Sequence, residues 1–248
     1  MEQVPAGRVR PEAPGRKRPA ALPVLAVPVD EQDVVRAALA WNLVVELARL
    51  GVGATLLAPT GETPSPIWPD AGPGPIGSAV VLARTENLSE FKRTVLDVAV
   101  ARAAEEPDGG VVVACMPPEW LHAASDEPML LRWALLFAST DRRDLMESYA
   151  IAKRLLLAGE KSRVGITIHG AQCVADAEHA FHHVADVSLR HLGRTLSSYG
   201  LLVDDLHIYR AIVARRPIGI EHPQSRAARA LQDVARMILE DARKLTVA

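Results

Sequence analysis

Three carboxylates and one arginine are crowded between a short apolar run and a long helical pattern near the start of the chain. The turn contains Asp30, Glu31 and Asp33 but neither glycine nor lysine, and Arg36 follows in the first turn of the helical pattern Val34–Leu50. Carboxylates at a helix N-terminus cap its free N–H groups and complement its dipole. A strand–turn–helix unit that binds phosphate needs the opposite chemistry, because glycine N–H groups and lysine charge must converge on the phosphate oxygens. We therefore expect this turn to repel phosphates.

Arg36 allows two interpretations. Its guanidinium could contact an anionic ligand, or it could form an ion pair with a carboxylate near the helix N-terminus. Ion pairs of this kind are common at protein surfaces. The sequence therefore favours the ion pair.

Composition restricts the class of protein. The chain has 248 residues, of which 49% are hydrophobic and 23% charged, with a formal net charge of −2. This length and hydrophobicity predict one large domain with a substantial core. A charge near zero supplies no phosphate-neutralising field, which argues against a nucleic-acid partner. Cys115 and Cys173 do not have the spacing of metal ligands or of a disulfide framework, so we expect a cytoplasmic protein. No apolar run is long enough to span a bilayer.

The first 22 residues differ from the rest of the chain. They are rich in proline, glycine and alanine and contain a basic run at Arg16, Lys17 and Arg18. This composition predicts a disordered, solvated basic tail, followed by a single domain over residues 23–248. Arg16, Lys17 and Arg18 are also candidates for contact with an acidic partner, nucleic acid or membrane.

Beyond the tail, short apolar runs alternate with longer patterns of helical spacing. Several runs are apolar at successive positions, which is typical of strands buried on both faces of a parallel sheet. The predicted strands are Val24–Val29, Ala54–Ala58, Ala79–Leu82, Val111–Cys115, Ala134–Ala138, Val164–Ile168 and Leu196–Leu201. The predicted helices are Val34–Leu50, Phe91–Glu105, Asp144–Leu157, Asp176–Leu192 and Ser225–Leu245. The alternation predicts an α/β fold with a doubly wound, mostly parallel sheet of about seven to eight strands and helices on both faces.

The segment 59–78 interrupts this alternation. Its prolines and glycines are incompatible with regular structure, so we expect a long loop. Trp68, in the middle of the loop, is either an anchor that folds the loop onto the body or an exposed contact for a partner.

The order and spacing of these elements resemble the MinD/ParA class of P-loop ATPases, and within that class the pattern is most similar to FlhG, a regulator of flagellar number. Asn42-Leu43 and Leu50-Gly51 stand where that class has N-L-A and L-G after the phosphate loop, without a gap. In the C-terminal half, residues 147–153, the Arg215-Arg216-Pro217 turn and residues 223–231 also resemble FlhG. The resemblance covers most of residues 23–245 and implies the MinD/ParA-like fold.

The chemical motifs of that class are nevertheless replaced. Its signature lysine corresponds to Glu31, its phosphate-contacting lysine to Arg36 and its magnesium-holding threonine to Ala37. The acidic motif at the end of the next strand of that class corresponds to Ala58-Pro59-Thr60. Its second acidic motif corresponds to a segment that starts at Cys115. The asparagine that contacts adenine in that class lies near His169. The resemblance thus outlines a vestigial pocket. Its residues are Asp30, Glu31, Asp33, Arg36, Ala37, Thr60, Cys115 and His169.

The resemblance together with these replacements predicts a pseudo-ATPase without cofactor, metal or catalytic residues. Such a protein would act through a protein partner, as an adaptor or positioning factor of a motility, secretion or polarity machine. Any dimer, of identical or different chains, would then be constitutive. The alternatives are a divergent, active NTPase that uses Arg36, and an unrelated small-molecule enzyme at the sheet edge around Cys115, His122 and His169.

Two helices carry further candidate residues. His179 and His183 are one helical turn apart, which is the spacing of metal ligands, but no third ligand is evident and we expect no metal site. The last helix, Ser225–Leu245, is amphipathic with charges of both signs on its polar face. That pattern favours packing on the body over contact with a membrane.

Overall fold

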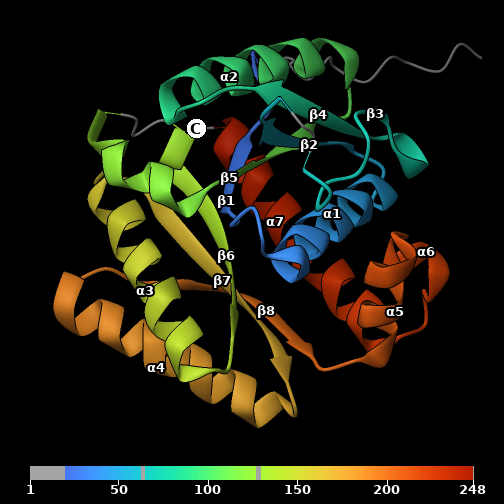
Figure 1. Cartoon of the computed structure of the whole chain (residues 1–248). Helices are drawn as coiled ribbons and strands as arrows, with labels where there is room; N and C mark the ends of the chain where they lie inside the picture. Colours follow the sequence, from blue (N-terminus) through green and yellow to red (C-terminus); the bar gives the residue numbers. More distant parts are fainter. Residues whose placement is uncertain (1–19, 63–64, 127–129, 248) are drawn as a thin grey trace, which may run out of the picture.

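A single eight-stranded sheet organises the part of the chain that the computed structural model describes, residues 20–62, 65–126 and 130–247 (Figure 1). The strand order is β3-β4-β2-β5-β1-β6-β7-β8. All neighbouring strands in this order are parallel except the short edge pair β3–β4. The strands are β1 (Val24–Pro28), β2 (Gly53–Thr60), β3 (Gly72–Pro73), β4 (Ser78–Arg84), β5 (Gly110–Met116), β6 (Trp133–Ser139), β7 (Arg163–Ala171) and β8 (Ser197–Val203).

Helices cover both faces of the sheet, as predicted for a doubly wound α/β fold. The helices are α1 (Val34–Arg49), α2 (Leu88–Glu105), α3 (Arg142–Leu157), α4 (Val174–Leu192), α5 (Leu206–Ala214), α6 (Ile218–Glu221) and α7 (Arg226–Val247), with short 3-10 helices η1 (Pro75–Gly77), η2 (Pro118–Asp126) and η3 (Leu130–Arg132). Helices α1 and α7 share one hydrophobic cluster with the sheet, and α2, α3 and α4 share the other (Figure 1). The central strands are therefore buried on both faces, which is why their sequences are apolar at successive positions.

The segment 59–78 is more regular than predicted. Residues 72–73 form β3, which pairs antiparallel with β4, and a 3-10 turn follows at Pro75–Gly77. A two-residue edge strand tolerates proline because it needs few N–H donors. Trp68 is only 8% exposed and joins the core cluster beneath α1, so it is an anchor of this segment.

The sequence also missed two short helices and placed the starts of α2, α3 and α4 two or three residues late. Helices α5 and α6 lie in a stretch for which no helix was predicted. Helix α2 begins at Leu88, three residues early, because the side chain of Asn87 caps it by accepting a hydrogen bond from the N–H of Glu90 at 3.0 Å. Leu22, assigned to the tail, is 3% exposed, and its N–H donates to the carbonyl of Ala99 at 3.0 Å.

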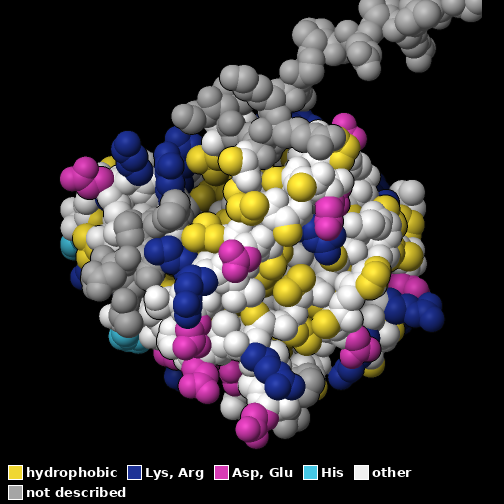
Figure 2. Space-filling view, turned by 90° about the horizontal axis from the view of Figure 1, so that it is seen from above, with side chains coloured by type: hydrophobic (Ala, Val, Ile, Leu, Met, Phe, Trp, Pro, Cys, Tyr) yellow, Lys and Arg dark blue, Asp and Glu magenta, His cyan; other side chains and the backbone are white. Residues whose placement is uncertain are grey.

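Two surface properties follow from the described residues. No helix among them is long and apolar enough to cross a bilayer. On the face seen from above, hydrophobic side chains are interspersed with acidic and basic ones (Figure 2).

Asn42 connects α1 to the distant α6. Its side-chain amide is 3% exposed and donates to the carbonyl of Ala38 at 2.7 Å, while its Oδ1 accepts from the N–H of Ile218 at 2.6 Å. Ile218 is the first residue of α6, so the asparagine satisfies one of the N–H groups that a helix start leaves unpaired. Asn42 thus has a structural role at the position where the sequence resembles the N-L-A segment.

We expect Asn42→Ala to lower the free energy of unfolding by about 1–3 kcal/mol, because it leaves the buried N–H of Ile218 without an acceptor. Urea unfolding at neutral pH measures the change. Gln224→Ala, at an exposed position, is the control and should change stability by less than about 0.5 kcal/mol. An equally small effect of Asn42→Ala would show that this connection is dispensable.

Candidate functional site

The turn between β1 and α1 is folded onto its own backbone. The N–H of Gln32 donates to Asp30 Oδ1 at 2.8 Å, the N–H of Asp33 to the carbonyl of Asp30 at 3.0 Å, and the N–H of Val34 to the carbonyl of Gln32 at 3.1 Å. No residue from 29 to 37, all of which are described, has a positive φ. The turn therefore lacks the left-handed backbone with which glycine-rich loops gather N–H groups around an anion.

Three N–H groups in the first turn of α1, those of Val34, Arg36 and Ala37, are paired in the same way. Asp33 is the N-cap, and its Oδ1 accepts from the N–H of Arg36 at 2.9 Å. The carbonyl of Asp33 accepts from the N–H of Ala37 at 3.0 Å, and the N–H of Val29 extends the sheet by donating to Met116 at 2.9 Å. A phosphate at this helix start would have to compete with the capping carboxylate for the same N–H groups.

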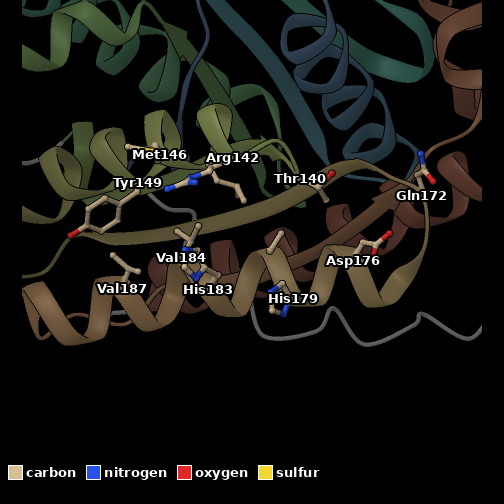
Figure 3. A pocket seen from close by; sticks show the side chains of 12 residues that line it. Thr140, Arg142, Met146, Tyr149, Gln172, Asp176, His179, His183, Val184 and Val187 are labelled. Atoms are coloured by element: carbon tan, nitrogen blue, oxygen red, sulfur yellow. The ribbon is translucent and has the colours of Figure 1, made fainter.

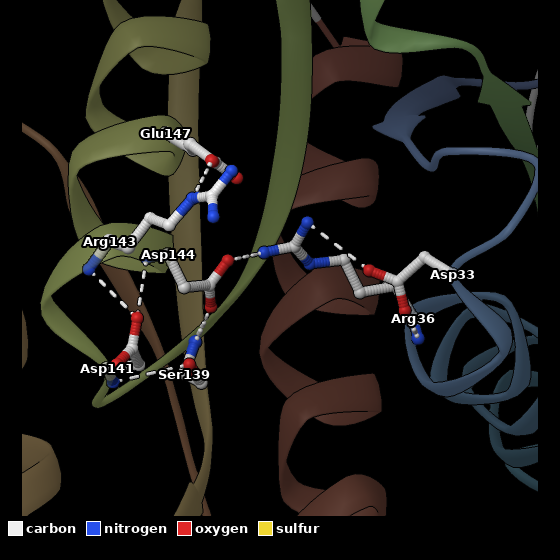
Figure 4. A network of polar contacts seen from close by, with 7 residues as sticks. All are labelled: Asp33, Arg36, Ser139, Asp141, Arg143, Asp144 and Glu147. Carbon is white, nitrogen blue, oxygen red and sulfur yellow. Dashed lines mark hydrogen bonds and ion pairs between the residues drawn. The ribbon is translucent and has the colours of Figure 1, made fainter.

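Arg36 joins the start of α1 to the start of α3 (Figure 4). Its Nη1 lies 3.3 Å from Asp33 Oδ2, and its Nη2 donates to Asp144 Oδ1. The other oxygen of Asp144 accepts the N–H of Ser139 at the end of β6. The arginine side chain is only 14% exposed and that of Asp144 20%. Of the two interpretations of Arg36, the ion pair is the one the structure contains.

The environment of Asp144 favours its charged form. Burial alone would raise its pKa, but the N–H of Ser139 and the guanidinium of Arg36 outweigh burial and hold the pKa below the usual value of an aspartate. Asp141, the N-cap of α3, fixes the helix start by accepting from the N–H groups of Arg143 at 2.8 Å and Asp144 at 3.1 Å. The carboxylate that holds Arg36 is thus itself held in place by α3.

His169 lies beside this ion pair at the end of β7. Burial lowers the pKa of His169, the positive charge of Arg36 lowers it further, and Asp144 and Asp33 offset only part of that. Its Nε2 is buried and has no hydrogen-bond partner among the described residues. The structure therefore brings His169 to the predicted site, as a neutral ring next to Arg36.

The rest of the predicted pocket is nearly filled. Glu31, Thr60, Trp68 and Cys115 line a cavity of about 140 Å³. Pockets for small molecules usually measure about 300–1,000 Å³. Trp68 forms part of the wall of this cavity, whereas Ala37 is fully buried in the core and does not line it. Among the predicted pocket residues, Asp30 and Glu31 remain exposed.

Cys115 and the histidines do not converge. Cys115 is fully buried, and burial raises the pKa of its thiol well above the usual range. His122 is exposed on η2, with its Nδ1 2.8 Å from the carbonyl oxygen of Glu119, and it does not line the cavity of Cys115. His169 lines a separate void of about 20 Å³. This arrangement supplies no base for a cysteine nucleophile.

Asp144 and Ser139 are the site residues that the sequence analysis missed. Asp144 was predicted at the start of a helix but not opposite Arg36. Local sequence carried no signal for this pair, because it depends on β6 lying beside β1, where parallel strands end at the same sheet edge and bring the following helix starts close together.

Two further groups of residues were singled out in the sequence, the basic run of the tail and the histidine pair of α4. Arg16, Lys17 and Arg18 lie outside the described residues. His179 and His183 both line a groove between α3 and α4. Among the described residues, no group of three histidine, cysteine, aspartate or glutamate side chains could hold a metal ion.

Comparison with known proteins relates the fold to one class. No family model and no curated protein matches the sequence. The structure is similar to the cell division protein MinD of Aquifex aeolicus (TM-score 0.61, 12% identity), covering 88% of this chain and 97% of that one. It is also similar to that organism's MinC:MinD complex (0.64, 13%), covering 88% and 96%, and to a ParA family ATPase from Chlorobium tepidum (0.57, 13%), covering 88% and 98%. The chain therefore has a MinD/ParA-like α/β fold.

The ion pair of Asp144 makes stability dependent on pH. Because its pKa in the native state lies below that of an unfolded aspartate, its charge stabilises the fold above about pH 4, and this contribution is lost as the pH falls through the native pKa. We expect Asp144→Asn to lower the free energy of unfolding by about 1–3 kcal/mol at pH 7. The difference from the unmodified protein should shrink towards about pH 3. Urea unfolding across this range measures both quantities.

Asp97→Asn, on an exposed position of α2, is the matched control and should leave stability within about 0.5 kcal/mol at each pH. A penalty for Asp144→Asn that stays constant down to about pH 3 would contradict the role assigned to its charge.

Proposed function

We propose that this chain is a pseudo-ATPase of MinD/ParA type, in which the segment that corresponds to the phosphate loop is a structural corner and the domain works through protein contacts. The observation that carries the proposal is the bonding of residues 29–37. Six of their nine N–H groups donate to protein oxygens of Asp30, Gln32, Asp33 and Met116, and Arg36 is neutralised by two carboxylates. A triphosphate would meet few free donors there and the exposed charges of Asp30 and Glu31.

The missing metal ligand supports the same proposal. Phosphoryl transfer depends on Mg²⁺ to neutralise charge on the phosphate oxygens. The threonine that would hold the ion corresponds to Ala37, which is 0% exposed and has no oxygen in its side chain. The arginine in place of the phosphate-contacting lysine already occupies the space between Asp33 and Asp144.

The role that remains is that of an adaptor or an assembly and positioning factor. One of the similar structures is a complex of MinD with MinC, in which the fold binds another protein. By the sequence resemblance to FlhG, the machine served by this chain is a motility, secretion or polarity system. The chain associates with a second copy or with a different protein through buried surface alone, and this association does not depend on ATP.

We expect no saturable binding in calorimetry at millimolar Mg-ATP or Mg-ADP. The double variant Asp30→Ala/Glu31→Ala removes the exposed charges and the acceptor of the Gln32 N–H, but leaves the N–H groups of Asp33, Val34, Arg36 and Ala37 bonded, so it should not bind either. Saturable heat, or a rise of several degrees in melting temperature with nucleotide, would contradict the proposal, because a ligand that binds the native state raises its stability.

The divergent NTPase is tested with the same protein. Hydrolysis of ATP that Arg36→Ala abolishes, but Arg93→Ala on the exposed surface of α2 does not, would establish that alternative. Our expectation is that neither variant changes the background rate, because Arg36 is engaged by Asp33 and Asp144.

Independence from ATP predicts a constant oligomeric state. We expect the molar mass from light scattering coupled to size-exclusion chromatography to be the same without nucleotide, with Mg-ADP and with a non-hydrolysable Mg-ATP analogue. A monomer that becomes a dimer only with the ATP analogue would contradict the proposal, because such a switch requires a working nucleotide site.

A further inference from the structure

A groove lies between α3 and α4, and its lining differs from that of the vestigial pocket. Its volume is about 840 Å³, it is open to solvent, and its walls are the two helices that cover β6 and β7 (Figure 3). None of the vestigial-pocket residues lines it.

The floor of the groove is apolar. Ala180 and Val184 of α4 form its buried part, at 5% and 3% exposed. Leu145, Tyr149 and Val187 are half-buried along its sides. The side chain of Met146, at 64% exposed, stands on the α3 rim. An exposed methionine beside an apolar floor is a common feature of surfaces that bind the apolar face of a helix.

The rim of the groove is rich in donors. Arg142 extends between the helices, and His179 and His183 lie on α4 opposite it (Figure 3). Arg142 forms no ion pair with another described residue. Among the lining residues the one carboxylate is Asp176, at the end of the groove where α4 begins. The rim therefore offers a carboxylate one guanidinium and two imidazole rings, with the one opposing carboxylate at the end of the groove.

The length of the groove fits a short helix. On α4 its lining residues run from Asp176 to Val187, about 16 Å at the helical rise of about 1.5 Å per residue. Three turns of a docked helix span that length and present apolar side chains at i, i+3 or i+4, and i+7. A small molecule is a poorer fit, because small-molecule sites enclose most of their ligand and this groove is open.

We propose that the α3–α4 groove binds an amphipathic helix of a partner protein, with its apolar face on Ala180, Val184 and Met146 and its acidic side chains on Arg142, His179 and His183. This rests on the proposed role in protein interaction and names the chemistry of the partner. It is independent of the turn at residues 29–37, so peptide binding and nucleotide binding test different claims.

The probe is a fluorescent, helix-forming peptide of about 15 residues with leucines at i, i+3 or i+4, and i+7 and glutamates flanking them. Fluorescence anisotropy with the full chain should show saturable binding that weakens as salt is added. The same peptide with lysines in place of the glutamates should bind at least about tenfold more weakly.

Four variants locate the binding. Met146→Glu and Arg142→Glu should each weaken binding of the glutamate peptide at least about tenfold. Leu157→Glu and Lys153→Glu are the matched controls, since both residues lie on α3 outside the groove and are exposed, Leu157 to 67%. Both controls should bind within about twofold of the unmodified chain. All four substitutions are at exposed positions, and circular dichroism checks that each variant is folded.

Three results would overturn the proposal. The first is equal binding of the glutamate and lysine peptides, or no binding of either. The second is equal loss in the controls. The third is a homodimer that Met146→Glu dissolves, which would make a second copy the occupant; light scattering detects it. If neither the peptide nor Mg-ATP binds, the groove proposal is overturned, whereas the proposal that the chain binds no nucleotide stands.

Discussion

The contact on which the site depends is the pairing of Arg36 with Asp144. These residues lie 108 positions apart, yet each sits in the first turn of a helix that follows a central strand. The guanidinium also reaches Asp33, the N-cap of its own helix, and Asp144 takes the N–H of Ser139. Arg36 thus links the starts of α1 and α3, and Asp144 extends the network to the end of β6. Removing either partner would leave a largely buried charge without compensation.

This arrangement changes what the sheet edge can do. In parallel α/β folds the carboxyl ends of the strands, with the helix N-termini behind them, form the usual ligand site. Here most backbone N–H groups of residues 29–37 donate to protein oxygens, and the cavity lined by Trp68 and Cys115 measures about 140 Å³. The hydrogen bonds that would hold a phosphate instead hold the domain together. Under the proposed function the protein uses this fold for its surfaces, one of which is the α3–α4 groove of about 840 Å³.

The sequence predicted what depends on local pattern. Buried parallel strands are apolar at successive positions, so β1, β2, β4 to β8 and the long helices could be located, and an arginine among carboxylates suggested an ion pair. The identity of Asp144 as its partner depends on which strands are neighbours, and local sequence does not encode that. Helix α6 has four residues, and its start is stabilised by Asn42 from a distant helix, so it has little signal of its own. Strand β3 was missed because prolines, which argue against a central strand, are tolerated at a sheet edge. The groove arises only when α3 and α4 pack side by side.

The central claim is that the bonded backbone donors of the β1–α1 turn, those of Gln32, Asp33, Val34, Arg36 and Ala37, are unavailable to a phosphate. Amide chemical shifts of these residues, followed by nuclear magnetic resonance while Mg-ATP is titrated to millimolar concentration, test it most directly. The account predicts that the amides of Gln32, Asp33, Val34, Arg36 and Ala37 keep their positions apart from small, non-saturating drifts. Saturable shifts converging on these amides would show that the turn opens to bind phosphate and would contradict the account.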